Sequence, residues 1–279
     1  MQLSPRYDGP PVIDIDVALG DVSVPLVRQR RRLGAVLADL DPEQWAAQSR
    51  CKAWSVQDVV AHLVGTNQFW TLSIVSGLSG RPTRFLASID PAVTPSQMVD
   101  ALRALPPSEI LDQYLTSSEE LADAVTDLDE TAWSTLAEGP PGHLALHAVA
   151  LHALWDAWIH ERDIVVPLAL AQGIEVDEVA GCLCYCAAIG PAVSVTQGST
   201  RAGTLAIVAT DPTLEFTVEM GSTVRVVDGA RDGATRIVGD AVTLVEGLSF
   251  RAPLDHGLAP SDAWLLGGLG EAFDQPPRR

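Results

Sequence analysis

Residues 151–163 constrain the fold of this chain more than any other stretch, because they place metal-binding side chains inside an apolar run. His152, Asp156 and His160 follow one another at intervals of four residues. In an α-helix of about 3.6 residues per turn, each step of four rotates by only about 40°, so the three side chains form one stripe. Burying two imidazoles and a carboxylate costs free energy unless they are hydrogen-bonded or bind a metal. The stretch therefore predicts a helix whose polar stripe is either hydrogen-bonded or binds a metal.

A further histidine lies on the apolar face of a second predicted helix. Ser55 and Asp58 resemble a capping box that starts this helix at Val56, and the periodicity carries His62 and continues to about Gly77. One histidine here and an Asp-x-x-x-His pair on another helix supply three ligands and leave open coordination positions, as is typical of catalytic metal sites. The alternative is a core histidine bonded to a backbone carbonyl, with a polar stripe that binds no metal.

The composition limits the partners of the protein. Hydrophobic residues make up 47% of the chain and charged residues 19%, which indicates a folded globular protein. The formal net charge of −18 argues against nucleic acid and anionic membranes, whose binding requires clustered lysine and arginine. The basic run at residues 28–32 lies within a helical pattern and is typical of a solvated helix face. No apolar run reaches the ~18 residues of a transmembrane helix, and no signal-peptide pattern is present, so we expect a cytoplasmic protein.

The four cysteines are consistent with that compartment. Cys51 is isolated, and a reactive thiol is one interpretation of it, supported only by two basic neighbours. Cys182, Cys184 and Cys186 alternate on a predicted helix, where successive members point about 200° apart. They cannot converge on one zinc ion, and we expect them to be small core residues.

Helical periodicity dominates the first part of the chain. Residues 1–21, which contain three prolines and two glycines, predict an irregular arm. Helices are expected at residues 24–40, 56–77, 96–105, 108–128 and 143–166, with a short helical turn around Trp45. His143 and His147 would lie on the side of the last helix that faces away from His152. The long loop at residues 80–95 is rich in proline and glycine.

The periodicity changes in the last third of the chain. Strands are expected at residues 204–210, 214–219, 223–227 and 235–238, and helices at 177–189, 240–247 and 261–273. Short turns between successive strands favour an antiparallel meander. The fold class is therefore α+β, with helices first and a smaller α/β domain with an antiparallel sheet after them. We place the domains at residues 22–170 and 171–279, with the boundary near residues 167–176.

Two motifs carry a resemblance to a known family. They are Trp-Ser-Val-Gln-Asp-Val-Val-Ala-His-Leu-Val-Gly at residues 54–65 and Trp-Asp-Ala-Trp-Ile-His-Glu-Arg-Asp-Ile at residues 155–164. In this order and spacing the chain resembles the mycothiol-dependent maleylpyruvate isomerase family. The resemblance implies a DinB-like metal-binding four-helix bundle. Residues 239–251 are similar to the sterol-carrier-protein-like C-terminal domain that accompanies this family.

The resemblance also implies roles for individual residues. It makes His62, Asp156 and His160 the metal ligands, although the family's isomerase has Glu where this chain has the shorter Asp156. It places Arg251 near the cleft between the domains, where a guanidinium would bind a carboxylate of the substrate or thiol; an ordinary surface salt bridge is the alternative. His152 lies outside the family triad and suits a residue that orients a ligand or a base that faces the substrate.

Two loop arginines complete the set of candidate site residues. Arg81 and Arg84 are candidates to bind an anionic cofactor or substrate, and exposed loop charges without a ligand are the alternative.

The family resemblance favours one chemistry. It implies a divalent metal, zinc being compatible with two histidines and a carboxylate, that activates mycothiol for attack on an electrophilic small molecule. Elimination after bond rotation gives an isomerase, and retention of the sulfur gives an S-transferase. The competing class is a non-catalytic carrier or scaffold for a small molecule or lipid. We expect a monomer or homodimer.

Overall fold

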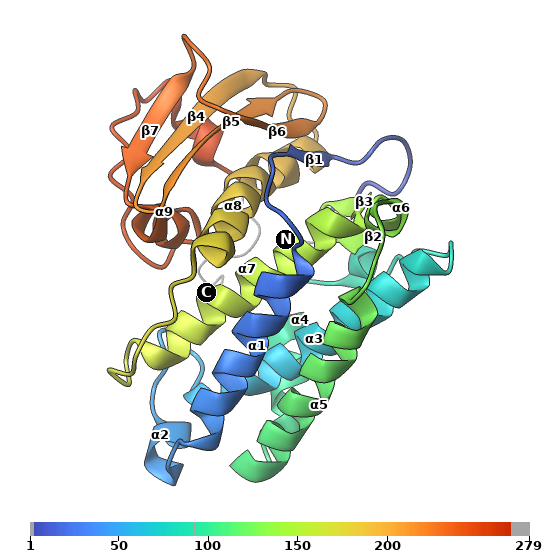
Figure 1. The fold of residues 1–279 in the computed structure, drawn as a ribbon, viewed down its shortest axis with the longest axis vertical. Helices are drawn as coiled ribbons and strands as arrows, with labels where there is room; N and C mark the ends of the chain where they lie inside the picture. Colours follow the sequence, from blue (N-terminus) through green and yellow to red (C-terminus); the bar gives the residue numbers. More distant parts are fainter. Residues whose placement is uncertain (1–2, 92, 269–279) are drawn as a thin grey trace.

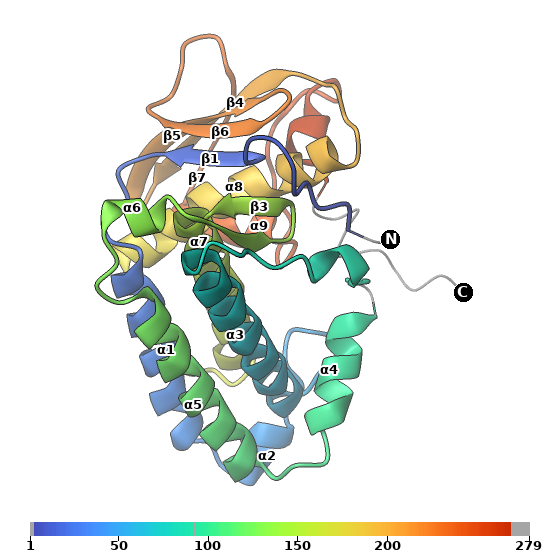
Figure 2. The same ribbon diagram turned by 90° about the vertical axis from the view of Figure 1, so that its right-hand side faces the viewer.

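A computed structural model describes residues 3–91 and 93–268 and shows a helical bundle packed against a five-stranded sheet (Figure 1). The bundle consists of α1 (Ser23–Ala38), α3 (Val56–Leu78), α5 (Pro107–Val125) and α7 (Leu146–Val165). Figure 2 shows α1, α3 and α5 side by side, with α4 (Thr94–Leu102) set apart from them. The predicted α+β class, with a helical bundle preceding a smaller α/β part, is confirmed. Three short helices complete this part: α2 (Pro42–Ala46), η1 (Leu86–Ser88) and α6 (Glu130–Trp133).

Local hydrogen bonds fix the start of α3 where the sequence predicts it. The Ser55 hydroxyl accepts from the Asp58 backbone N–H at 3.2 Å, and the Asp58 carboxylate accepts from the Ser55 N–H at 3.0 Å. This reciprocal capping box satisfies two N–H groups that a helix end leaves unpaired. Because α3 begins at Val56, His62 lies in its second turn, on the side that meets α7.

The predicted helix at residues 143–166 is wrong at its start. Strands β2 (Leu136–Gly139) and β3 (Gly142–Ala145) form an antiparallel hairpin, and α7 begins only at Leu146. Gly142 has a φ of +123°, and a Cβ there would lie 2.0 Å from the carbonyl oxygen of Arg6. The backbone N–H of His143 also donates to that oxygen at 3.1 Å, so this segment pairs with the N-terminal part of the chain and cannot be helical. His143 therefore lies in β3, whereas His147 lies in the first turn of α7.

The sheet is mixed, in the order β1-β6-β5-β4-β7. Strands β4 (Gly203–Thr210), β5 (Thr213–Met220) and β6 (Val224–Asp228) form the predicted antiparallel meander. The expectation of a wholly antiparallel sheet is wrong, because β7 (Thr235–Gly239) crosses over and pairs with β4 in parallel. The alternation that predicts a strand does not show which edge of the sheet it joins.

The N-terminal segment is also less irregular than predicted. Residues 13–16 form β1 (Ile13–Asp16), which pairs in parallel with β6. Ile13 is buried and packs into the apolar core shared with the sheet. The prolines and glycines around this short strand conceal it in the sequence, and its pairing depends on the free edge of β6 more than two hundred residues later.

Helix α8 (Val176–Thr196) lies between α7 and the sheet (Figure 1). By length and composition alone this helix could cross a membrane, contrary to the expectation that no apolar run is long enough. However, 78% of its most apolar stretch is buried inside the protein, so the helix serves here as a core helix. Cys182, Cys184 and Cys186 are all buried there, which confirms that they are core residues.

One apolar core runs from α7 through α8 into the sheet, so the helical and sheet parts pack without a gap. The chain passes between them at residues 166–175. The connection is reinforced by Arg32 of α1, which contacts Glu161 of α7 and Glu178 of α8, both at 2.7 Å. Helix α9 (Ala241–Leu248) follows the sheet as predicted. The predicted helix at 261–273 is a single 3₁₀ turn, η2 (Ala263–Leu266), within the described residues; residues 269–273 lie outside them.

Candidate metal centre

Three side chains converge where α3 and α7 face each other. His62 of α3 faces Asp156 and His160 of α7, and their ligand atoms all lie within 4.8 Å of one another. The Asp156 Oδ1 atom is 3.9 Å from His62 Nε2 and 3.7 Å from His160 Nε2. Neighbouring ligand atoms of a tetrahedral zinc ion are separated by roughly 3.3 Å, so inward movements of about half an ångström would bring these three atoms to a metal. We call these three residues the metal triad.

The charges of the triad fit a cation. The Oδ2 atom of Asp156 is buried and has no hydrogen-bond partner among the described residues. Burial alone would raise the pKa of Asp156, but the interaction with His62 and the charge of the nearby imidazoles outweigh it and hold that pKa well below its usual range. Burial lowers the pKa of His62, so this ring is neutral at pH 7. A buried, ionised oxygen without a hydrogen-bond partner is costly, and a metal ion bound by the triad would remove that cost.

His160 is oriented by a residue that our sequence analysis did not identify. Its Nδ1 atom is 3.0 Å from Oδ2 of Asp163, one helical turn further along α7. Burial lowers the pKa of His160, but the bonds to Asp163 and Cys51 and the charge of Asp156 outweigh it and raise this pKa to about 10. A carboxylate that holds one ring nitrogen leaves the other, here Nε2, as the metal ligand. The His-x-x-Asp spacing on one helix is a signal that could have revealed Asp163.

Asp163 is itself held by two arginines. Its carboxylate is fully buried and accepts from Arg50 Nε at 3.1 Å and from Arg251 Nε at 3.0 Å. Burial would raise the pKa of Asp163, but the bond to His160 and the nearby positive charges keep it well below its usual range. Arg251 follows α9 in the sheet part of the chain, and this contact holds it against the last turn of α7, beside His160. Its partner is thus a buried carboxylate that supports a triad histidine.

Cys51 belongs to the same cluster. Its Sγ atom is 3.2 Å from Asp163 Oδ2 and 3.9 Å from His160 Nδ1, so these three residues form a second group with metal-binding geometry. The two guanidinium groups on Asp163 already neutralise that carboxylate and would repel a divalent cation there. The metal triad, with its unpartnered oxygen, is therefore the better cation site. No local pattern in the sequence places Cys51 beside α7, because the contact spans more than a hundred residues.

The predicted residue His152 lies next to the triad but is not part of it. It is buried on α7, one turn before Asp156, and its Nδ1 atom is 2.6 Å from the Tyr185 hydroxyl of α8. Burial lowers the pKa of His152 to about 4, so the ring is neutral at pH 7. The nearby Trp155 donates its indole N–H to Ser249 at 2.8 Å, a further contact between α7 and the segment after α9.

The two loop arginines lie away from the triad. Both follow the end of α3 at Leu78, which is about 24 Å along the helix from His62 at ~1.5 Å per residue. Arg84 contacts Asp8 at 3.4 Å and lies over the Tyr7 ring, and Arg81 is exposed. The structure therefore does not bring these two arginines to the metal triad. The helix length that separates them was already visible in the sequence.

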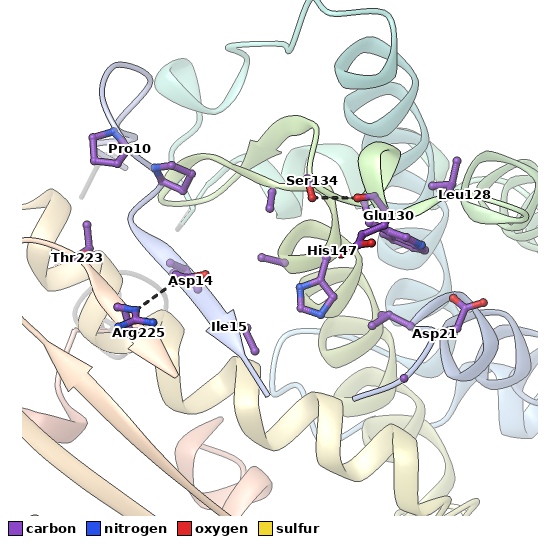
Figure 3. A pocket seen from close by; sticks show the side chains of 17 residues that line it. Pro10, Asp14, Ile15, Asp21, Leu128, Glu130, Ser134, His147, Thr223 and Arg225 are labelled. Carbon is purple, nitrogen blue, oxygen red and sulfur yellow. Dashed lines mark hydrogen bonds and ion pairs between the residues drawn. The ribbon is translucent and has the colours of Figure 1, made fainter. Parts of the chain in front are cut away.

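A cavity of about 780 Å³ lies in another part of the molecule. Figure 3 shows the side chains that line it. The cavity lies between β1, the start of α7 and β6, and its polar lining includes Asp14, Asp21, Glu130 and His147. The salt bridge from Arg225 to Asp14, at 3.1 Å, crosses its edge. None of the metal triad lines it, so this cavity is not part of the candidate metal centre.

The fold and the triad define a helical-bundle protein with a candidate metal centre, and comparisons with known proteins assign it to a family. Residues 26–165 match the model of the mycothiol maleylpyruvate isomerase N-terminal domain. This match covers half of the chain, which therefore belongs to that family.

Relatives and solved structures extend this assignment. Uncharacterized proteins from two strains of Mycobacterium tuberculosis are 26% identical over 143 residues, which is 50% of this chain and 53% of theirs. The chain thus spans about half the length of the curated relatives it matches. The crystal structure of a mycothiol-dependent maleylpyruvate isomerase matches with a TM-score of 0.60 at 14% identity, covering 88% of this chain and 95% of that one. A mutant of such an isomerase matches with a TM-score of 0.60 at 13% identity, covering 85% and 90%. At identities this low, the structural similarity shows a shared fold and does not extend to function.

Proposed function

We propose that this protein is a mycothiol-dependent metalloenzyme that promotes attack of the thiol on an electrophilic small molecule. His62, Asp156 and His160 would hold the divalent metal. The observation that carries the proposal is the buried, unpartnered Oδ2 of Asp156 beside two imidazoles. When bound there, a divalent metal supplies Lewis acidity, which lowers the pKa of a coordinated thiol.

The residues around the triad would prepare the site. Asp163 holds His160 so that Nε2 faces Asp156, and Arg50 and Arg251 hold Asp163 in turn. The Trp54 ring lies 5.0 Å from the His62 ring and would exclude water from that side. The two guanidiniums also place positive charge next to the centre, which supports an anionic substrate or a thiol that carries a carboxylate.

The proposal has two branches that differ in the fate of the sulfur. In an isomerase of the maleylpyruvate type, the sulfur leaves after a bond of the substrate has rotated. In an S-transferase, the sulfur stays on the product. Membership of the family supports thiol chemistry in general, and the similar isomerase structures support the first branch through fold alone.

Metal content tests the proposal most directly. We expect about one equivalent of divalent metal in the wild type by elemental analysis, and its loss in His160→Ala. His147→Ala is a matched control, because His147 lies on the same helix outside the triad, and it should keep the metal. Wild-type protein that stays metal-free after reconstitution would contradict the proposal and favour the carrier alternative. If metal binds, consumption of mycothiol in the presence of maleylpyruvate, followed by product analysis, distinguishes the two branches.

A further inference from the structure

The ring of His152 is held beside the metal triad without belonging to it. Its centroid lies 4.6 Å from Trp70, 5.3 Å from Trp155 and 5.0 Å from Tyr185. Asp156 follows one turn later on the same helix. Its negative charge acts on the His152 ring and partly offsets the effect of burial on the pKa of His152. The ring is therefore fixed in orientation next to the atoms that would bind a metal.

The Tyr185 hydroxyl determines which ring nitrogen carries the proton. Tyr185 is fully buried, and His152 Nδ1, at 2.6 Å, is the only partner of its hydroxyl in the described part of the chain. A buried hydroxyl hydrogen without an acceptor is costly. The hydroxyl therefore donates to Nδ1, which must be the unprotonated nitrogen. A neutral imidazole carries one N–H, so the hydrogen lies on Nε2.

The Nε2–H group is left for a ligand. Within residues 3–91 and 93–268 no acceptor bonds to His152 Nε2. This atom is also not among the fully buried atoms that lack a partner, so Nε2 keeps some accessible surface that a ligand can reach. The Oδ2 atom of Asp156 has no partner either, which means that the two groups do not satisfy each other.

We propose that His152 is a neutral hydrogen-bond donor, not a general base, and that Nε2–H binds a carbonyl oxygen of the substrate beside the metal triad. The inference rests on the proposed function and applies to an electrophile in which a carbonyl is conjugated to the attacked C=C bond. When a thiolate adds to such a bond, its lone pair forms the S–C bond and the π pair moves to the carbonyl oxygen. That oxygen becomes negative and accepts a stronger hydrogen bond, while His152 gains and loses no proton. When the electron pair returns, the S–C bond breaks and the thiolate leaves.

The tautomer can be observed directly. Two-bond ¹H–¹⁵N correlation spectra of zinc-loaded protein with ¹⁵N-labelled histidine distinguish the two neutral tautomers, and the His152→Gln variant assigns the signal. We expect an unprotonated Nδ1 and a protonated Nε2 between pH 6 and 8. In Tyr185→Phe, which keeps the ring but removes the donor, the signal should shift toward a mixture of tautomers. A protonated Nδ1 in the wild type would overturn the inference.

Substitutions at position 152 separate a donor from a base. The amide nitrogen of a glutamine can take the place of Nε2 as a donor, but an amide cannot accept a proton at neutral pH. With mycothiol and maleylpyruvate we expect His152→Ala to lose about 100-fold in kcat with little change in KM, and His152→Gln to stay within about tenfold of the wild type. If both variants lose activity equally, the donor role is wrong. If the wild type has no thiol-dependent activity, the proposed function fails, and the tautomer measurement still decides the state of His152.

Discussion

Replacing Asp163 with asparagine tests how strongly the centre depends on one buried carboxylate. The side chain is 0% exposed, and its partners Arg50 and Arg251 are 19% and 22% exposed. Asp163→Asn keeps the shape of the side chain but removes its charge. Arg50 retains its bond to Glu246 at 2.9 Å, whereas Arg251 loses the carboxylate that it contacts at 3.0 Å. Removing one partner of a buried ion pair costs about 3–5 kcal/mol, and we expect a loss near the lower end because Arg50 stays paired.

Two measurements check this prediction. Chemical denaturation of metal-free protein should show the free energy of unfolding reduced by ~3 kcal/mol, with no change in the m-value. Competition with a chromophoric chelator should show zinc affinity reduced about 10- to 100-fold, because His160 loses the carboxylate that orients it. Asp8→Asn is the control, since Asp8 forms an exposed pair with Arg84 and should change neither quantity. A loss below about 1 kcal/mol together with unchanged zinc affinity would refute the reasoning from burial.

Three further predictions concern pH and packing. In the metal-free protein the raised pKa of His160, about 10, contributes stability that is fully present below pH 6.5 and is lost as the pH rises through 10. Metal must displace that proton, so calorimetry in buffers of different ionisation enthalpy should detect about one proton released per metal between pH 7 and 8; no release would contradict this assignment. Glu138 is buried and accepts from Tyr7, Thr83 and the backbone of Phe85 and Leu86, so Glu138→Ala should cost ~3 kcal/mol in denaturation and leave the metal content unchanged. Gly142→Ala should cost more than about 2 kcal/mol because a Cβ there would collide with Arg6. Gly198→Ala, at a φ of +94° in open space, is the control for the conformational cost, and equal losses in the two variants would contradict a steric contribution at Gly142.

Much of the site follows from local spacing. The i,i+4 relation of Asp156 and His160 and the capping box before Val56 depend only on neighbouring residues, and the structure shows both. The same is true of the alternating strands β4 to β6 and of the buried cysteines on α8. Asp163 could have been found in the same way, because one helical turn after a ligand histidine is the position of an orienting carboxylate.

The remaining features depend on contacts between distant parts of the chain. Two strands join the sheet where an edge is free in the folded protein: β1 pairs with β6, and β7 crosses over to β4. The start of α7 is delayed by a hairpin, because the segment before it bonds to the backbone carbonyl of Arg6. Cys51 and Arg251 meet at Asp163 only because the loop before α3 and the turn after α9 both pack on α7. Sequence spacing therefore determined which side chains share one helix face, since the backbone repeat fixes that directly. Tertiary packing decided which faces then meet, because burial and long-range contacts have no local signature in the sequence. It thereby also decided the partners, the charge and the tautomer of the side chains between those faces.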